Sequence, residues 1–330
     1  MRVRAQDYLT SEEIRSLVQR SDWRAALEVG WNWLVIAAAF ALVAWHPAWY
    51  TVVPALFLIG GKQLGCAIIM HDASHRSLFR TEWLNQTVGQ WLGAWPIFND
   101  TERYRPYHLR HHTRTGRADD PDLNLTLGYP TTKASMSRKI GRDLSGATGL
   151  KGNYGLLAMH LGYLEYSLGG VIHKLDQTGR RAWDVLLTGW RNLRGPLAAN
   201  AILFVILWAT GHPWLYLLWI GAYLTTYNFS LRVRSIAEHS VVPDREDDQR
   251  NTRTTYANFL EKLLFAPLNV NYHAEHHLLM TVPCYHLPRM HRMLKDRGYY
   301  ERGVLAPNYM SVLIQAAQKS AKHPPAVQNA

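Results

Sequence analysis

Cysteine is scarce in this chain of 330 residues. The two cysteines, Cys66 and Cys284, lie far apart in the sequence. They predict no disulfide framework, and they exclude the cysteine-rich ligand sets that structural zinc sites usually have. We therefore expect a reduced, cytosol-like environment around the part of the protein that carries its chemistry.

The sequence also lacks the pattern of a cleaved signal peptide. Its first apolar run begins near residue 29, behind a leader, residues 1–28, that is rich in Arg and Glu. This order predicts an uncleaved membrane anchor preceded by a cytosolic, amphipathic leader. We recognise no internal repeat of fixed period and no fused electron-carrier domain.

Charge and aromatic content narrow the choice of partners. Lys and Arg exceed Asp and Glu by 36 to 25, which gives a net charge of +11. Such an excess is typical of proteins that bind nucleic acid or an anionic membrane surface. The 13 Trp and 17 Tyr residues favour the membrane, because amphipathic aromatic side chains collect at membrane–water interfaces. We expect a membrane partner and no nucleic acid.

Four apolar segments approach the length of about 20 residues that a membrane-spanning helix needs. They form two closely connected pairs: residues 29–46 with 50–70, and residues 196–211 with 213–231. We predict an all-α integral membrane protein with four transmembrane helices in two hairpins. Residues 71–195 and 232–300 then form a helical cap, and residues 301–330 form a C-terminal tail. The alternative is a soluble helical protein in which both hairpins are buried.

The distribution of basic residues predicts the orientation. The two tight turns, residues 46–49 and 211–213, contain no Lys or Arg, whereas the leader, the cap and the tail contain nearly all of them. Because positively charged loops stay on the cytoplasmic side, we expect both turns outside and the cap in the cytosol. The plasma (inner) membrane is the location that we expect.

Histidine is present in an unusual pattern. The chain has 16 histidines, a content that predicts about 0.04 chance copies of His-x-x-His-His. It has two copies, at residues 108–112 and 273–277, and a His-x-x-x-His at residues 71–75. On a helix, positions i, i+3 and i+4 share one face, so each cluster aims its imidazoles at one point, as metal ligands do.

An even number of predicted spans separates the clusters, so all of them face the same side of the membrane. One site can then collect the eight clustered histidines together with His239, which closely follows the fourth apolar segment. The candidate metal ligands are His71, His75, His108, His111, His112, His239, His273, His276 and His277. Nine imidazoles exceed what one ion binds, so we expect two metal ions. Ordinary polar groups on the cap surface are the alternative.

Six carboxylates lie close to these histidines in the sequence. They are Asp72, Glu238, Glu275, Asp119, Asp120 and Asp122. A metal-bound imidazole usually donates its other N–H to a carboxylate or carbonyl, so we expect these acids to orient the ligands. Surface ion pairs with nearby arginines are the alternative. The Glu-x-x-His ligands of water-soluble di-iron bundles are missing, which predicts a site dominated by histidine.

The three clusters resemble the histidine boxes of the membrane fatty acid desaturase family, in the same order and spacing relative to two helix hairpins. The segments Ala237-Glu238-His239 and Asn-Val-Asn-Tyr-His-Ala-Glu-His-His-Leu at residues 269–278 are also similar, and the resemblance runs from about residue 28 to 300. It implies a four-helix membrane domain with a cytosolic cap. It also implies two iron ions held by the histidines and O₂-dependent C–H cleavage on an acyl chain.

Details of the resemblance indicate the type of enzyme. The first box has three spacer residues, as in acyl-lipid members, and the third box begins with His273, where front-end members commonly carry Gln. The His-Pro-Gly-Gly signature of a fused cytochrome b5 is missing, so the resemblance implies an external reductant, a separate ferredoxin-like or b5-like carrier. Ser235 stands where some acyl-CoA members have an Asn that reaches a metal through water, which puts that contact in question.

Lys62 is an unusual residue to find inside the second apolar segment. A Lys at the centre of a membrane costs about 2.5–3.5 kcal/mol on insertion scales, and such residues are candidates for a functional role. We expect contact with a polar or anionic group of the substrate. Snorkelling, or pairing with Gln63, is the alternative.

Three functions remain open at this point. A fatty acyl desaturase and a hydroxylase or ketolase acting on a lipid, alkane or carotenoid begin with the same hydrogen abstraction. A zinc-dependent membrane hydrolase or a metal-binding transport protein is the third. Zn²⁺ cannot change its oxidation state, so a requirement for O₂ and a reductant separates the third function from the first two.

Overall fold

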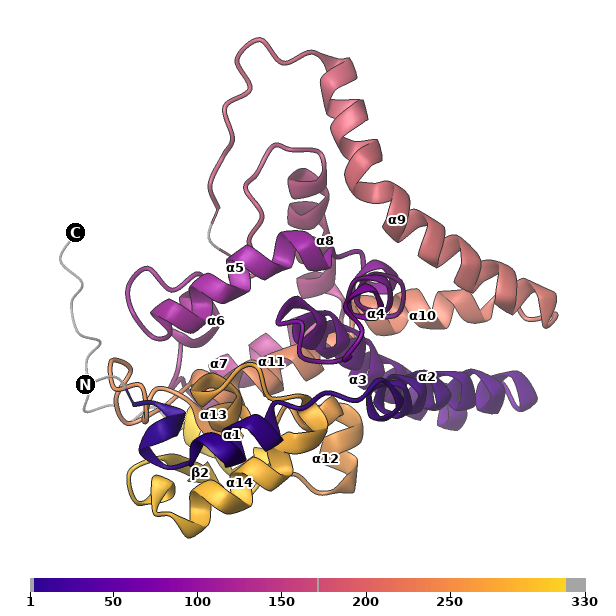
Figure 1. Ribbon diagram of the computed structural model, residues 1–330. Helices are drawn as coiled ribbons and strands as arrows, with labels where there is room; N and C mark the ends of the chain where they lie inside the picture. The colour runs from indigo at the N-terminus through magenta and orange to yellow at the C-terminus, as the bar shows by residue number, and fades with distance from the viewer. Residues whose placement is uncertain (1–2, 171, 319–330) are drawn as a thin grey trace.

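A long helical hairpin is the most regular part of the molecule. The computed structural model describes residues 3–170 and 172–318. The hairpin consists of α2 (Asp22–Trp45) and α3 (Trp49–Ser74), which extend to the right in Figure 1. The first predicted hairpin is therefore present, although α2 begins inside the predicted leader.

Local chemistry explains where this hairpin begins and turns. The hydroxyl of Ser21 accepts a hydrogen bond from the backbone N–H of Arg24 and so caps the start of α2. Pro47 follows the end of α2 and cannot continue a helix. The hydroxyl of Thr51 then donates to the carbonyl oxygen of His46 at 2.6 Å, which closes the turn into α3.

The second predicted hairpin differs from the expectation. Its first helix is α9 (Ala182–Ala209), which begins well before residue 196. The segment 213–231 does not form one span, because the chain leaves helical geometry at Thr225 (φ −115°, ψ −86°), between α10 (Leu215–Leu224) and α11 (Thr226–His239). The hydroxyl of Thr225 donates to the carbonyl oxygen of Gly221 at 2.6 Å and supports this break.

Among the described residues, three helices, α2, α3 and α9, are long and apolar enough to cross a membrane. The predicted count of four is not confirmed. In α2 and α9 most of the apolar length faces outward, with Trp31, Leu34, Trp190 and Ile202 all about half exposed or more. In α3 most of it is buried, so α3 is the central helix of the group.

Glycines allow neighbouring helices to approach α3 closely. A Cβ atom at Gly60 would lie 2.6 Å from the backbone nitrogen of Tyr227, at the start of α11. A Cβ at Gly61 would lie 2.6 Å from the carbonyl oxygen of Leu263, in α12 (Phe259–Leu264). Only a residue without a Cβ fits these two contacts.

Short helices between α3 and α9 form the first part of the cap. They are α4 (Glu82–Val88), the single-turn π-helix η2 (Gly89–Ala94), η3 (Trp95–Ile97), α5 (Thr101–Arg114), α6 (Leu123–Thr126), α7 (Lys133–Leu144) and α8 (Ala147–His160). The carboxylate of Asp100 accepts from the backbone N–H of Arg103 at 3.0 Å and caps α5. In Figure 1, α5 runs above the buried end of α3.

The chain after α11 completes the cap. Its elements are β1 (Arg253–Thr255), α12, η4 (Pro267–Asn269), α13 (His273–Leu278), η5 (Cys284–His286), α14 (Leu287–Asp296), η6 (Tyr299–Glu301), β2 (Val304–Ala306) and α15 (Tyr309–Ala316). β1 and β2 form a parallel pair in which Thr254 is opposite Leu305. The prediction of a purely helical protein is therefore wrong for these six residues, whose pairing satisfies the backbone of the buried segment β1.

The predicted leader and tail belong to the folded unit. Ahead of α2 the chain forms η1 (Ala5–Asp7) and α1 (Ser11–Leu17), and Leu17 packs with Met290 and Leu294 of α14. In Figure 1, α1 and α14 lie together at the lower left. α15 packs on α11 through Val312, so the predicted tail is structured as far as this helix. The remainder of the tail, 319–330, lies outside the described residues.

Gly61→Ala should lower the melting temperature of the detergent-solubilised protein. The added Cβ would meet the backbone of Leu263 and Leu264 at 2.6 and 2.7 Å, so α3 and α12 would have to separate. Overpacking of this kind costs about 1–3 kcal/mol. Size-exclusion chromatography of the heated protein, detected by fluorescence, measures the shift.

Gly30→Ala is the matched control for this variant. Gly30 is an exposed glycine of α2, and apart from its chain neighbours and the backbone of its own helix, no atom of the described residues lies within 4 Å of a Cβ built there. Ala is favoured over Gly in a helix by roughly 1 kcal/mol, so this variant should keep or raise the melting temperature. Equal melting temperatures for the two variants would contradict the close packing of α3.

Candidate metal centre

The buried end of α3 supplies the first two histidines of the site. His71 lies in the last turn of α3, and His75 follows as the C-cap residue, so both side chains leave the helix on one side. The hydroxyl of Ser74 donates to the carbonyl oxygen of His71 at 2.6 Å and ties down the helix end. The turn that begins α3 is roughly 33 Å away from His71 along the helix axis.

Three other helices bring the remaining histidines to this point. α5 carries His108, His111 and His112 on its last turns. His239 is the last residue of α11. α13 is only six residues long and carries His273, His276 and His277. The structure thus brings together all nine histidines that the sequence singled out.

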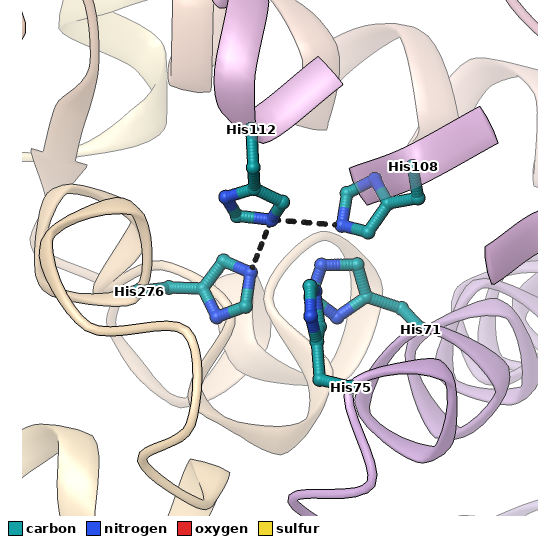
Figure 2. A group of neighbouring side chains, drawn as sticks. All are labelled: His71, His75, His108, His112 and His276. Atoms are coloured by element: carbon teal, nitrogen blue, oxygen red, sulfur yellow. Dashed lines mark hydrogen bonds between the residues drawn. The ribbon is translucent and has the colours of Figure 1, made fainter. Parts of the chain in front are cut away.

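The nine histidines fall into adjoining groups whose ligand atoms lie within 4.8 Å of one another. The first group has five members: His71, His75, His108, His112 and His276, which Figure 2 shows converging from three segments. The second group is His111, His239 and His277, and His239 also meets His273 and Glu238. The rings of His112 and His277, with centroids 4.3 Å apart, join the two groups.

The imidazole nitrogens face one another at the spacing of metal ligands. The Nε2 atom of His112 lies 3.0 Å from Nε2 of His108 and 3.1 Å from Nε2 of His276, the two dashed contacts in Figure 2. In the second group, Nε2 of His273 and His239 are 2.8 Å apart. Two nitrogens that are each about 2.1 Å from one ion, at right angles, lie about 3 Å from each other.

Several of these buried nitrogens have no hydrogen-bond partner among the described residues. They include Nε2 of His71, Nε2 of His277 and both ring nitrogens of His75. Leaving buried polar atoms unpaired is costly, and a single N–H cannot satisfy three nitrogens that converge on it. The donor set therefore fits metal ions, and it is rich in the imidazole that iron, copper, nickel and zinc accept.

Burial favours the neutral form of most of these imidazoles. It lowers the pKa of His108, His112 and His276 well below the ordinary value, and the neighbouring histidines lower it further. Burial also lowers the pKa of His75 and of His239 to about 3. A neutral imidazole offers the lone pair that a metal binds, so the site is ready for a metal at physiological pH.

Carboxylates orient some of the histidines from outside. His111 donates from Nδ1 to Oδ1 of Asp120 at 2.8 Å, and Asp120 also accepts from the backbone N–H of Gly116. Burial lowers the pKa of His111, but Asp120 and Asp122 outweigh this effect and raise it. An ionised carboxylate only accepts hydrogen bonds, so the proton of His111 lies on Nδ1. The Nε2 atom of His111 is then available as a metal ligand in the second group. Tyr107 donates to Asp122.

Asp72 and Glu238 lie beside ligands in a similar way. Nδ1 of His71 lies 2.8 Å from Oδ1 of Asp72. Glu238 accepts from Nε of Arg234 at 2.6 Å, and one of its oxygens lies 3.5 Å from Nδ1 of His273. Burial raises the pKa of Glu238 to about 7 although Arg234 opposes this. Both acids therefore lie beside box histidines, but only Asp72 is at hydrogen-bond distance from one, and the orienting role of both stays a prediction.

Asp119 and Glu275 depart from the prediction. Asp119 is exposed and pairs with Arg114 at 3.3 Å, the surface alternative. Glu275 is fully buried, but its carboxylate accepts from Thr254, His291 and Tyr300 instead of a box histidine.

This network around Glu275 contains residues that the sequence reasoning missed. It connects α13 to β1, α14 and η6, so it holds the short helix that carries the third box. In the sequence, the only indication of this network was the position of Glu275 inside the third histidine box.

Lys62 is buried in α3, at 2% exposure, and does not line the cavity described below. The structure does not bring it together with the histidines. Its neighbour Gln63 donates to the carbonyl oxygen of Trp219 at 2.9 Å, and the carbonyl oxygen of Lys62 itself accepts from Asn32 of α2. The predicted contact with a substrate group therefore finds no support in the position of this side chain.

A cavity of about 620 Å³ reaches the histidines from one side and opens to the surface. His108, His111, His239 and His273 belong to its wall. Apolar side chains from three helices also line it, among them Met70 of α3, Leu156 of α8 and Leu231 of α11. Its volume lies within the range of about 300–1,000 Å³ that ligand pockets have, so a molecule can bind with one part against the imidazoles.

Comparisons with known proteins agree with this geometry. A family model described as fatty acid desaturase matches residues 47–307. Dihydrorhizobitoxine desaturase of Bradyrhizobium elkanii is 27% identical over 292 residues, which cover 83% of this chain and 76% of that protein. An sn-1 oleoyl-lipid 12-desaturase of Picosynechococcus sp. is 23% identical over 301 residues, 86% of this chain and 80% of the relative.

A shorter similarity adds a ferredoxin-linked relative. The sn-1 acyl-lipid omega-3 desaturase (ferredoxin) of Nostoc sp. is 28% identical over 115 residues, 33% of this chain and 30% of that protein. The match of the family model over most of the chain, together with the convergence of all three histidine boxes, identifies this protein as a member of the fatty acid desaturase family.

Proposed function

We propose that this protein is a membrane-bound, O₂-dependent di-iron desaturase that introduces a C=C bond into an acyl chain. The observation that carries the proposal is the meeting of nine imidazoles in two adjoining groups, four of which, His108, His111, His239 and His273, line a cavity whose wall is in part apolar. The names of the relatives support an acyl-lipid substrate.

The donor set supports iron. His71, His75, His108, His112 and His276 would hold one ion, and His111, His239, His273 and His277, with Glu238 beside them, would hold the other. Bound iron supplies, with O₂ and an external reductant, the oxidising power needed to remove hydrogen from an unactivated methylene. Zinc accepts the same imidazoles but has no second oxidation state to offer.

The chain's own residues have three tasks in this reaction. Asp120 and Asp72 hold a proton on Nδ1 of His111 and His71, which keeps each Nε2 directed inward. The apolar wall of the cavity, including Met70 and Leu231, binds the alkyl part of the substrate and excludes water from the inner end. The helices α3 and α5 fix the position of that end, because they carry five of the histidines on rigid elements.

The remaining parts of the proposal concern partners and location. Three apolar helices support insertion into a membrane, and the basic cap supports a cytosolic orientation in a plasma (inner) membrane. Electrons would come from a separate carrier, ferredoxin-like or cytochrome b5-like. The ferredoxin in the name of the Nostoc relative favours the first of these carriers.

Expression of the chain in a bacterial host should create new unsaturated acyl chains. Mass spectrometry of the host lipids should find species two hydrogens lighter than those of cells that carry the empty vector, and only in the presence of O₂. A gain of one oxygen in place of this loss would show a hydroxylase or ketolase. Unchanged lipids in aerated cells that contain metal-loaded protein would contradict the proposal.

His111→Ala and His276→Ala should each reduce product formation more than about 100-fold, because each removes a ligand from a different group. Both proteins should still insert into the membrane, since α2, α3 and α9 are unchanged. Membrane fractionation and iron analysis of the purified proteins measure the two effects. His46→Ala, in the exposed turn between α2 and α3, is the matched control and should keep full activity.

Asp120→Asn should lower the affinity for iron about 10–100-fold, because the amide cannot hold the Nδ1–H of His111 as a carboxylate does. Iron retained against increasing concentrations of a chelator measures this loss. Asp119→Asn changes the adjacent residue, which is exposed and pairs with Arg114, and should retain iron like the unmodified protein. Equal iron loss from both variants would contradict the role of Asp120.

A further inference from the structure

The wall of the cavity carries positive charges that form no ion pair with a carboxylate of the described residues. Lys139 of α7, Lys151 of α8 and Arg245 line it. Among the described residues, none of these three forms an ion pair with Asp or Glu; Arg245 donates only to the carbonyl oxygen of Thr126, at 3.4 Å. This part of the wall therefore has an excess of positive charge.

The carboxylates of the same wall are already engaged. Asp120 binds His111, Asp122 accepts from Tyr107, and Glu238 accepts from Arg234. They lie at the histidine end of the cavity, so they do not compensate the cations of the other end. The cavity therefore has a metal-binding end and a cationic end.

Lys139 is the cation with the most defined position at the second end. Its Nζ lies 4.1 Å from the ring centre of the buried Tyr129. The hydroxyl of the same tyrosine accepts from Nη1 of Arg232 at 3.3 Å, so the two cations meet one ring. Arg232 is neutralised by both oxygens of Asp143, to which Thr148 also donates, whereas Lys139 is not.

The surroundings make the charge on Lys139 unfavourable without a counter-ion. Burial lowers its pKa, and Arg232 and Arg142 lower it further, while Asp143 opposes them. A bound anion would reverse this penalty, because an opposite charge nearby favours the charged form of the lysine. The cation–π contact with the face of Tyr129 favours the observed position of Nζ.

Helix α11 runs along the cavity from one end towards the other. His239, Ser235, Arg232 and Asn228 all line the cavity, at helical spacings that place them along one face of α11. Arg232 precedes His239 by two turns, or roughly 10 Å along the helix axis. Lys139 contacts the same tyrosine as Arg232, so it lies beside a part of α11 that is two turns away from His239.

We propose that Lys139 binds the anionic group, a carboxylate or a phosphate, of the molecule whose alkyl part lies against the histidines. The proposal rests on the proposed function for calling that molecule the substrate, but anion binding itself can be tested without turnover. Lys151, more exposed on α8, and Arg245 also line the cavity and add to its positive potential.

The test is equilibrium binding to the purified full-length protein in detergent. Hexadecanoate and its neutral methyl ester are the first pair of probes, and 1-palmitoyl lysophosphatidate and 1-palmitoyl glycerol are the second. A charge-assisted contact should favour the anion of at least one pair about tenfold. Preference within the first pair identifies a carboxylate, and preference within the second pair identifies a phosphate.

Variants assign this preference to a residue. Lys139→Met should abolish it while binding of the neutral probe stays unchanged, and Lys139→Arg should retain it. Lys133→Met removes the same charge from an exposed position of α7 outside the cavity and should bind like the unmodified protein. Melting temperatures of all variants show whether each protein is folded.

Two results would overturn the proposal. The first is that the unmodified protein binds neutral and anionic probes equally, or binds neither. The second is that the preference for the anion survives in Lys139→Met. A protein that prefers the anion through Lys139 but forms no desaturated lipid would refute the desaturase function and leave the anion site standing. The two proposals can thus fail separately.

Discussion

The convergence of unpaired imidazole lone pairs in a buried place is the constraint on which this structure depends. The Nε2 atom of His112 lies about 3 Å from Nε2 of His108 and from Nε2 of His276, and lone pairs at this distance repel one another unless an N–H or a cation lies between them. Four separate elements, α3, α5, α11 and α13, must therefore be held against this repulsion. Packing elsewhere in the molecule has to supply the stabilisation that these atoms do not provide for themselves.

The helices meet this constraint by different means. α3 is long, central and packed through Gly60 and Gly61, so its end is positioned by the helices that pack against it, α2, α10, α11 and α12. α13 is too short to be stable alone and depends on the buried carboxylate of Glu275, which gathers donors from three neighbouring elements. The three-residue strand β1 belongs to the same support, since Thr254 is one of these donors.

Residue spacing predicted the site better than it predicted the fold. Helical spacing identified the eight clustered histidines, because helical periodicity is local, whereas His239 was identified by its position just after the fourth apolar segment. Hydropathy did not detect the break at Thr225, where side-chain and backbone hydrogen bonds end α10. The same periodicity argues against the role expected for Glu275. Glu275 follows His273 by two residues, so its side chain points away from the helix face that carries the ligands. The choice between Asp119 and Asp120 depends on a loop whose conformation no pattern specifies.

The position of α11 connects the chemistry of the two cavity ends. One rigid helix carries His239 at its end and Arg232, the neighbour of Lys139, two turns earlier. The separation of the ends is therefore a property of helix geometry and not of a mobile loop. Under the two proposals above, if the anionic group of the substrate is held beside Lys139, the rigid spacing along α11 between the two cavity ends would decide which part of its alkyl chain lies against the imidazoles.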